Sequence, residues 1–138
     1  MTRIRKSTIK EIALAIARDK TCFLHRTAKK VTIIDHSAED AKLIAAQAKL
    51  EQKIGNFIKI EQFSTEEQLV IMRDFADELD NKSLRRELSN ALNRKNPVRN
   101  FNGVIESNMD LNLHWRSYRM EEYQRWVSNF IADAYHYH

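Results

Sequence analysis

The feature that most constrains this chain is a long aromatic stripe near its C-terminal end. The stripe persists at helical spacing for some five turns and comprises Trp115, Tyr118, Glu122, Trp126, Val127, Phe130, Ile131 and Ala134, all of them apolar or aromatic except Glu122. A helix over residues 111–134 would be about 35 Å long at 1.5 Å per residue, roughly the width of a domain of this size. The spacing predicts that these aromatic side chains, together with Phe101, mainly close a hydrophobic core rather than form a stacking platform.

Five further helices are expected before this stripe, most of them with a recognisable start. The first three are 8–18 with a Thr8–Glu11 capping box, about 38–53 after Asp35 or Ser37 with Gly55 as the stop, and 65–79 with a Ser64–Glu67 capping box. The fourth begins after Asp80 or Asn81 and ends before Pro97. The fifth is 97–107, with Asn96 as the cap and Pro97 at the first position. The last helix opens at Asn108 or Asp110.

Three short runs have strand character. Thr21–His25 and Lys30–Ile34 are separated by four residues and predict a hairpin, and residues 57–61 predict a third strand. The sequence therefore predicts an α+β fold: a mostly helical single domain, residues 1–138, in which helices cover a small antiparallel three-stranded sheet. Residues 1–6 are expected to form a flexible basic arm.

Charge alternates in blocks along the chain. The net charge is +4, but residues 64–81 carry one Lys or Arg against six Asp or Glu, whereas residues 82–101 carry six against one. Alternating blocks are a weak argument for a nucleic-acid partner. The basic N-terminus lacks the apolar run of a signal peptide, and no window of the sequence is apolar enough to cross a bilayer. The single cysteine, Cys22, cannot form an internal disulfide. Together these features predict a cytoplasmic protein with no membrane partner.

No pattern indicates a reaction, a metal or a cofactor. The chain has no phosphate-cradling glycine loop, nucleophile elbow or zinc spacing. His114, His136 and His138 lack ligand spacing, and the acidic residues between 66 and 78 fit a solvated helix face. We therefore expect no catalytic residue, no metal site and no cofactor.

The second half of the chain resembles a bacterial family. The segments that carry the resemblance are Phe63-Ser64-Thr65-Glu66-Glu67, Ile71-Met72-Arg73-Asp74-Phe75-Ala76, Leu84-Arg85-Arg86-Glu87-Leu88, Val98-Arg99-Asn100-Phe101 and Trp115-Arg116-Ser117-Tyr118-Arg119. Over residues 57–131 they are similar to Uncharacterised Protein Family 0158. The chain departs from that pattern where Pro97 and Val98 precede Arg99. The resemblance implies no activity, because none is established for the family.

Three arginines are the main candidates for binding. Arg99 falls in the first turn of a helix, where free N–H groups attract anions, and Arg116 and Arg119 lie one turn apart on the last helix, with Trp115 beside them. A phosphate or an acidic peptide would suit this group. The alternative is that the arginines form internal salt bridges with the acidic face of residues 66–78.

The leading functional hypothesis is a non-catalytic binding or regulatory module that engages a protein or anionic partner between the Pro97 helix and the last helix. A second hypothesis is RNA binding through the basic segments 3–6 and 85–99, whose contacts would be Arg3, Arg5, Lys6, Arg85, Arg86, Arg94 and Lys95. An unrecognised enzyme is the third.

Overall fold

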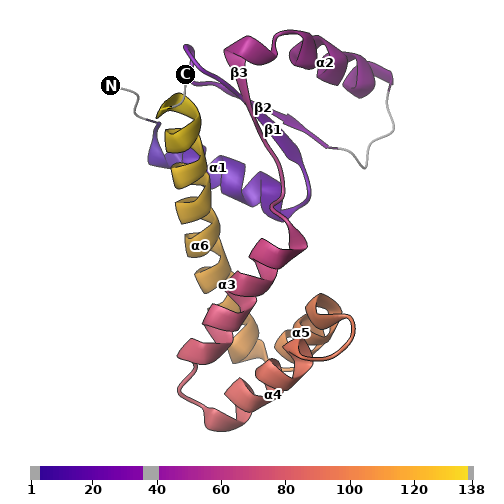
Figure 1. Ribbon diagram of the computed structural model, residues 1–138, viewed down its shortest axis with the longest axis vertical. Coiled ribbons are helices and arrows are strands. Elements are labelled where there is room, and N and C mark those ends of the chain that lie inside the picture. Colours follow the sequence, from indigo (N-terminus) through magenta and orange to yellow (C-terminus); the bar gives the residue numbers. More distant parts are fainter. Residues whose placement is uncertain (1–3, 36–40, 137–138) are drawn as a thin grey trace. The chain divides into compact units, whose positions relative to one another are not determined.

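The computed structural model describes residues 4–35 and 41–136, which form two compact units. The sheet unit comprises residues up to Gln62 together with those from Tyr123 onward, and the helical unit comprises Phe63–Glu122. Both are drawn in Figure 1. The predicted class is confirmed: helices dominate, and the sheet is small, three-stranded and antiparallel.

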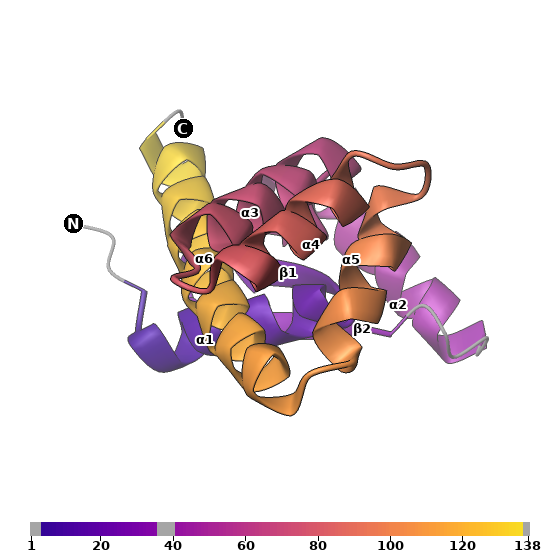
Figure 2. The same ribbon diagram turned by 90° about the horizontal axis from the view of Figure 1, so that it is seen from below.

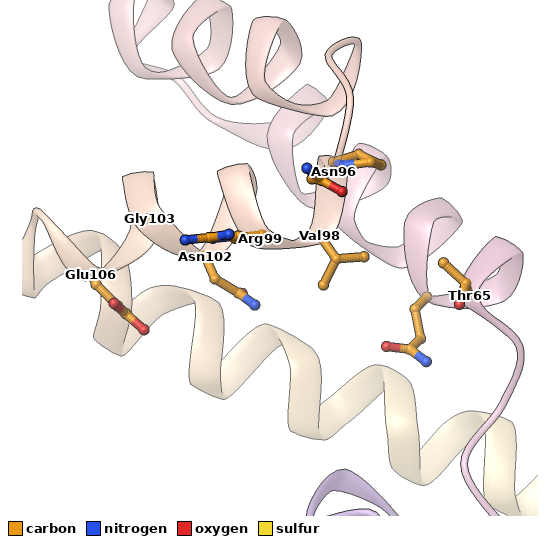
Figure 3. A pocket seen from close by; sticks show the side chains of 9 residues that line it. Thr65, Asn96, Val98, Arg99, Asn102, Gly103 and Glu106 are labelled. Atoms are coloured by element: carbon orange, nitrogen blue, oxygen red, sulfur yellow. The ribbon is translucent and has the colours of Figure 1, made fainter.

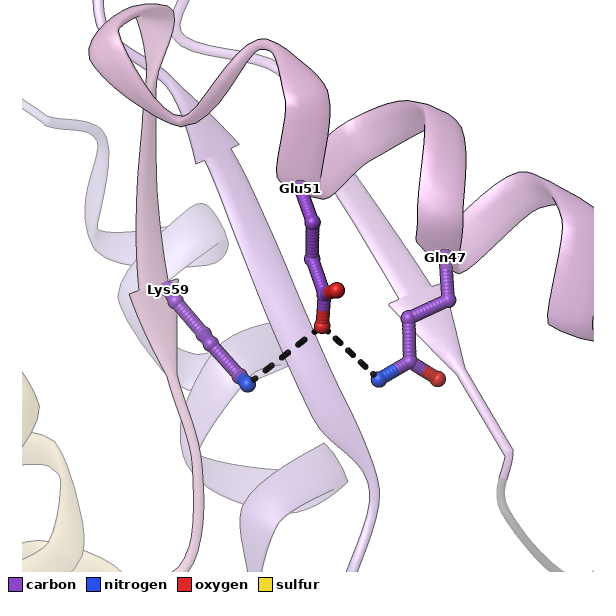
Figure 4. Close-up of polar contacts among 3 residues, drawn as sticks. All are labelled: Gln47, Glu51 and Lys59. Carbon is purple, nitrogen blue, oxygen red and sulfur yellow. Dashed lines mark hydrogen bonds and ion pairs between the residues drawn. The ribbon is translucent and has the colours of Figure 1, made fainter.

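The sheet has β1 (Thr21–His25) at its centre, between β2 (Val31–Ile34) and β3 (Phe57–Ile60). Cys22 lies opposite Ile33 on one side and Ile60 on the other, so alternate residues share a face. On the first face Cys22, Leu24, Ile58 and Ile60 are buried and Ile33 is exposed, and on the other face Phe23 is fully buried. Lys59 projects from the other face and pairs with Glu51 of α2 (Ala41–Gln52) at 3.9 Å (Figure 4).

The hairpin turn closes without glycine. The His25 side chain accepts a hydrogen bond through Nδ1 from the Ala28 N–H at 2.9 Å, and Lys29 takes the left-handed conformation with φ 56°. The His25 ring also packs edge-on against Phe57 at 5.1 Å. This histidine therefore stabilises the turn.

The first helix begins earlier than predicted. Helix α1 is Lys6–Ala17, with Arg5 at the N-cap position and no side-chain cap. The predicted Thr8–Glu11 capping box is wrong, because the Thr8 and Ile9 N–H groups already bond to the Arg5 carbonyl at 3.0 and 3.1 Å. The predicted Ser37 cap of the second helix lies outside the described residues. A short 3-10 turn, η1 (Ile54–Asn56), joins α2 to β3.

The helical unit contains α3 (Thr65–Glu78), α4 (Lys82–Leu92), α5 (Pro97–Glu106) and the first half of α6 (Met109–His136). Helix α3 begins with the predicted Ser64–Glu67 capping box, and the Asn81 and Asn108 side chains cap α4 and α6. Helices α4 and α5 lie side by side, as Figures 1 and 2 both show.

Phe75 is the centre of the helical unit's core. Its ring lies 6.4 Å from that of Phe101, 5.1 Å from that of Trp115 and 5.2 Å from that of Tyr118. Phe75 and Phe101 are fully buried, and Trp115 nearly so. The prediction that the aromatic side chains close the core is confirmed for Phe101 and Trp115, whereas Tyr118 is half-buried.

Helix α6 runs through both units as one continuous helix of 28 residues. In the sheet unit it buries Tyr123, Val127 and Ile131. The predicted stripe is wrong in two places there, since it omitted Tyr123 and included Phe130, which is 36% exposed. Among the described residues, no helix has the length and apolar character needed to span a membrane.

Candidate functional site

The start of α5 has an unusual backbone. Asn96, at the N-cap position, is left-handed with φ 59° and ψ 56°, and its side chain forms no capping hydrogen bond, contrary to its predicted role as a cap. Asn100 fixes the turn instead, because its Nδ2 donates to the Lys95 carbonyl at 2.8 Å. Pro97 has no N–H, and the first-turn N–H groups of Val98 and Arg99 have no acceptor inside the helix. The positive end of α5 therefore remains available to an acceptor from outside.

Two hollows flank this helix. The α3–α5 hollow has a cavity volume of about 810 Å³ and is lined by Thr65, Gln68, Asn96, Pro97, Val98, Arg99, Asn102, Gly103 and Glu106. Figure 3 shows Thr65 at the start of α3, and Val98, Asn102 and Glu106 along α5. The α4–α5 hollow, about 530 Å³, is lined by Glu87, Asn90, Ala91, Arg94, Arg99, Asn100, Gly103, Val104 and Ser107. Only Arg99 and Gly103 line both.

Of the three arginines in the main predicted group, Arg99 is the one that lines these hollows. Its side chain is exposed, and it makes no ion pair within the described part of the chain. The predicted alternative, an internal salt bridge to the acidic residues between 66 and 78, is therefore not formed by Arg99. One carboxylate, that of Glu106, lines the α3–α5 hollow with it.

The other members of the predicted group lie elsewhere in the helical unit. Arg116 is exposed and Arg119 is half-buried on α6, and neither lines the two hollows. Trp115 is buried against Phe75 and Phe101, so it supports the first half of α6 rather than offering a contact surface. The two hollows at α5 hence contain one arginine of the predicted three.

The residues predicted for RNA binding divide between the two units. Arg94 lines the α4–α5 hollow with Arg99, and Arg85, Arg86 and Lys95 lie on or just after α4. Arg5 and Lys6 belong to the start of α1 in the sheet unit. Arg3 lies outside the described residues.

The polar residues around Arg99 were not among the predicted site residues. Asn102, Gly103 and Glu106 follow Arg99 at three-, four- and seven-residue spacing, which places all four on one face of α5. That periodicity is visible in the sequence, but the prediction for this helix rested on Arg99 and the apolar positions alone. Thr65 and Gln68 come from a different helix, and no local pattern connects them to α5.

In residues 4–35 and 41–136, no group of three or more His, Cys, Asp or Glu side chains is placed to hold a metal ion. The strongly shifted thiol lies in the sheet unit instead: burial, and secondarily the Glu11 carboxylate, raises the pKa of Cys22 to about 12. A thiol that stays protonated is a poor nucleophile.

A family model matches residues 3–136, nearly the whole chain, and its description is "Uncharacterised protein family (UPF0158)". The chain belongs to the UPF0158 family. The resemblance seen over residues 57–131 therefore extends into the sheet unit, including its hairpin. The description of UPF0158 names no activity.

A curated relative carries the same family name. It is the UPF0158 protein PA5073 of Pseudomonas aeruginosa, which is 28% identical over 133 residues, covering 94% of this chain and 85% of the relative. No solved structure matches the chain.

Proposed function

We propose that this UPF0158 protein is a non-catalytic binding module that engages an acidic segment of a partner protein at the start of α5. The observation that carries the proposal is the position of Arg99. Its exposed guanidinium lies in the first turn of α5, has no ion pair among the described residues and lines both hollows.

The electrostatics of α5 favour an acidic ligand. A helix N-terminus carries a partial positive charge, and the free N–H groups of Val98 and Arg99 point out of it. A carboxylate there can accept from backbone N–H groups while the Arg99 guanidinium forms a bidentate pair with it or with its neighbour.

The lining of the α3–α5 hollow suits a peptide better than a lone ion. Gln68 uses its Nε2 to donate to the Phe63 carbonyl at 3.0 Å, which holds its amide in place and leaves its Oε1 able to accept a peptide N–H. Thr65 and Asn102 add a hydroxyl and an amide. A cavity volume of about 810 Å³ exceeds what one carboxylate needs, so side chains on either side of it can be accommodated.

The experiment is a titration with a fluorescent deca-glutamate peptide. Arg99→Ala should weaken binding at least about tenfold, because it removes a hydrogen bond to a charged group. Arg73→Ala is the matched control: it loses the same charge in the same unit, but Arg73 is an exposed α3 residue that lines neither hollow. Equal affinity for the wild type and the Arg99 variant would contradict the proposal.

Arg116 and Arg119 belong to the same proposal as a secondary contact surface on α6. Replacing both with alanine should weaken polyanion binding less than Arg99→Ala does, while the melting temperature changes little. A large loss of stability without a loss of binding would show instead that these two side chains are structural.

A second candidate function is RNA binding, which the α4–α5 hollow favours. Arg94 and Arg99 both line it, together with the amides of Asn90 and Asn100, which can read base edges or phosphates. A steep fall in affinity for a single-stranded RNA between 50 and 200 mM salt, about 300-fold for six phosphate contacts, would support this function. A shallow salt dependence would favour the acidic peptide.

A further inference from the structure

The sheet unit carries a groove that the proposed function does not use. It runs between the start of α1 and the second half of α6. One part, about 890 Å³, is lined by Ile4, Arg5, Lys6, Ile9, Gln124, Arg125 and Ser128. The other, about 430 Å³, shares Ile4, Ile9 and Ser128 and adds Ile131, Ala132, Tyr135 and His136. The shared residues make the two parts one continuous groove, here called the α1–α6 groove.

The groove separates charge from apolar surface. Arg5, Lys6 and Arg125 cluster at one end, and Arg5 and Lys6 are exposed and make no ion pair within the described residues. Ile4 and Ile9 lie half-buried along the middle. A ligand that fills this groove must therefore be acidic and must also carry an apolar group.

The length of the groove matches a short helix. Its lining advances twelve residues along α6, from Gln124 to His136, which is about 18 Å. Helix α3 has 14 residues and is about 21 Å long.

Helix α3 also has the required chemistry on its solvent side. Glu66, Val70, Asp74 and Asp77 recur at three- and four-residue spacing on the face opposite its buried residues. Val70 is 53% exposed in the middle of this face, and the three acidic residues make no ion pair in the described part of the chain. Arg73 is the one cation on the same face.

The charges of the two units agree with such a pairing. Residues 1–62 and 123–138 together carry fourteen Lys and Arg against eight Asp and Glu, whereas residues 63–122 carry nine against eleven. Opposite charges across an interface steer association and set its register.

We propose that the α1–α6 groove binds the acidic outer face of α3 from a second copy of this chain. The carboxylates of Asp74 and Asp77 face the basic end of the groove, and Val70 packs on the isoleucines. Each copy has one groove and one acidic face, so the contact joins two different surfaces and every copy can both offer a groove and fill one.

The test is reciprocal charge reversal, read by sedimentation equilibrium against the 16.3 kDa mass of one chain. The groove variant is Arg5→Glu with Lys6→Glu, and the face variant is Asp74→Lys with Asp77→Lys. These four side chains are exposed and unpaired within the described residues, so both variants should fold, which far-UV circular dichroism verifies. Lys49→Glu with Lys53→Glu on and just after α2 is the matched control, because it makes the same change in charge away from the groove.

The wild type and the control should associate with rising concentration. Each reversed variant alone should associate at least about tenfold more weakly, because like charges then oppose each other. An equimolar mixture of the two variants should regain association, since the acidic groove then meets a basic α3 face and the basic groove meets an acidic one.

Three results would overturn the proposal. They are a wild type that stays at monomer mass, a groove variant that associates as well as the wild type, and a mixture that associates no better than its components. Binding of dodecanoate by a protein that remains monomeric would assign the groove to an anionic amphiphile instead of a second copy.

Discussion

Phe75 shows how much of the helical unit's stability rests on one side chain. Its ring contacts Phe101, Trp115, Tyr118 and the ring of His114, which is 5.0 Å away. Phe75→Ala should lower the free energy of unfolding by about 3–5 kcal/mol, because it removes a fully buried ring and leaves a cavity. Urea unfolding measures this, with Leu113→Ala, an exposed residue of α6, as a control expected to change little. A loss below about 1 kcal/mol would mean that Phe75 does not organise this core.

Cys22 gives a pH dependence whose sign follows from its raised pKa. The thiol of the folded chain keeps its proton up to about pH 12, against 9.0 for the ordinary value, which we take for the unfolded chain. Above pH 9 the unfolded chain loses this proton while the folded chain keeps it, so the free energy of unfolding falls as the pH rises toward 12. The fall is at most about 1.4 kcal/mol per pH unit, and below pH 9 the contribution of Cys22 is fully present. Stability curves of the wild type and Cys22→Ala should consequently converge above pH 9. Parallel curves between pH 8 and pH 11 would contradict this.

At the scale of residues, burial was more predictable than function. The spacing of Phe101 and Trp115 correctly indicated a core, because helical periodicity reports directly which side faces the protein. The binding role of the exposed face of α5 was harder to predict, because polar residues such as Asn102 and Glu106 are expected on any helix face that contacts solvent. They can contribute to a site only because Thr65 and Gln68 of α3 line the same hollow, and that depends on the tertiary structure.

At the scale of elements, the Ser64 cap is the clearest agreement between sequence and structure. The Ser64 hydroxyl accepts from the Glu67 N–H at 3.2 Å, and the Glu67 carboxylate accepts from the Ser64 N–H at 3.3 Å. Ser64→Ala should cost about 1 kcal/mol in the free energy of unfolding. Ser83→Ala, in the first turn of α4, is the control, and an equal effect of both substitutions on chemical denaturation would contradict a specific capping role.

Capping patterns failed where the backbone offered an alternative. Thr8 and Glu11 have the same spacing as Ser64 and Glu67, yet α1 starts at Lys6 because the Arg5 carbonyl already accepts from two N–H groups. The Asn96 side chain does not cap α5 for a related reason. Its backbone is left-handed, and the turn before the helix is held by the hydrogen bond from Asn100 to the Lys95 carbonyl. Sequence spacing identifies side chains able to cap a helix, but the path of the preceding backbone decides whether they do.

For the whole molecule, the single-domain prediction can be tested by calorimetry. Helix α6 contributes buried residues to both units, Leu111 and Trp115 to one and Val127 and Ile131 to the other. Loss of either unit's core would remove the packing of half of a continuous helix, so we expect one cooperative transition with equal calorimetric and van't Hoff enthalpies. Two resolved transitions would show that the units unfold as separate domains.

The binding function depends on where an acidic ligand contacts the chain, and a ¹⁵N NMR titration with unlabelled deca-glutamate locates that contact directly. The proposed function predicts the largest shifts at the backbone amides of Val98, Arg99 and Gly103 and at the side-chain amide of Asn102, and in Arg99→Ala the remaining shifts should saturate only at a peptide concentration at least about tenfold higher. Shifts confined to the α1–α6 groove, or no shifts along α5 at saturating peptide, would contradict the proposal that the start of α5 is the binding site.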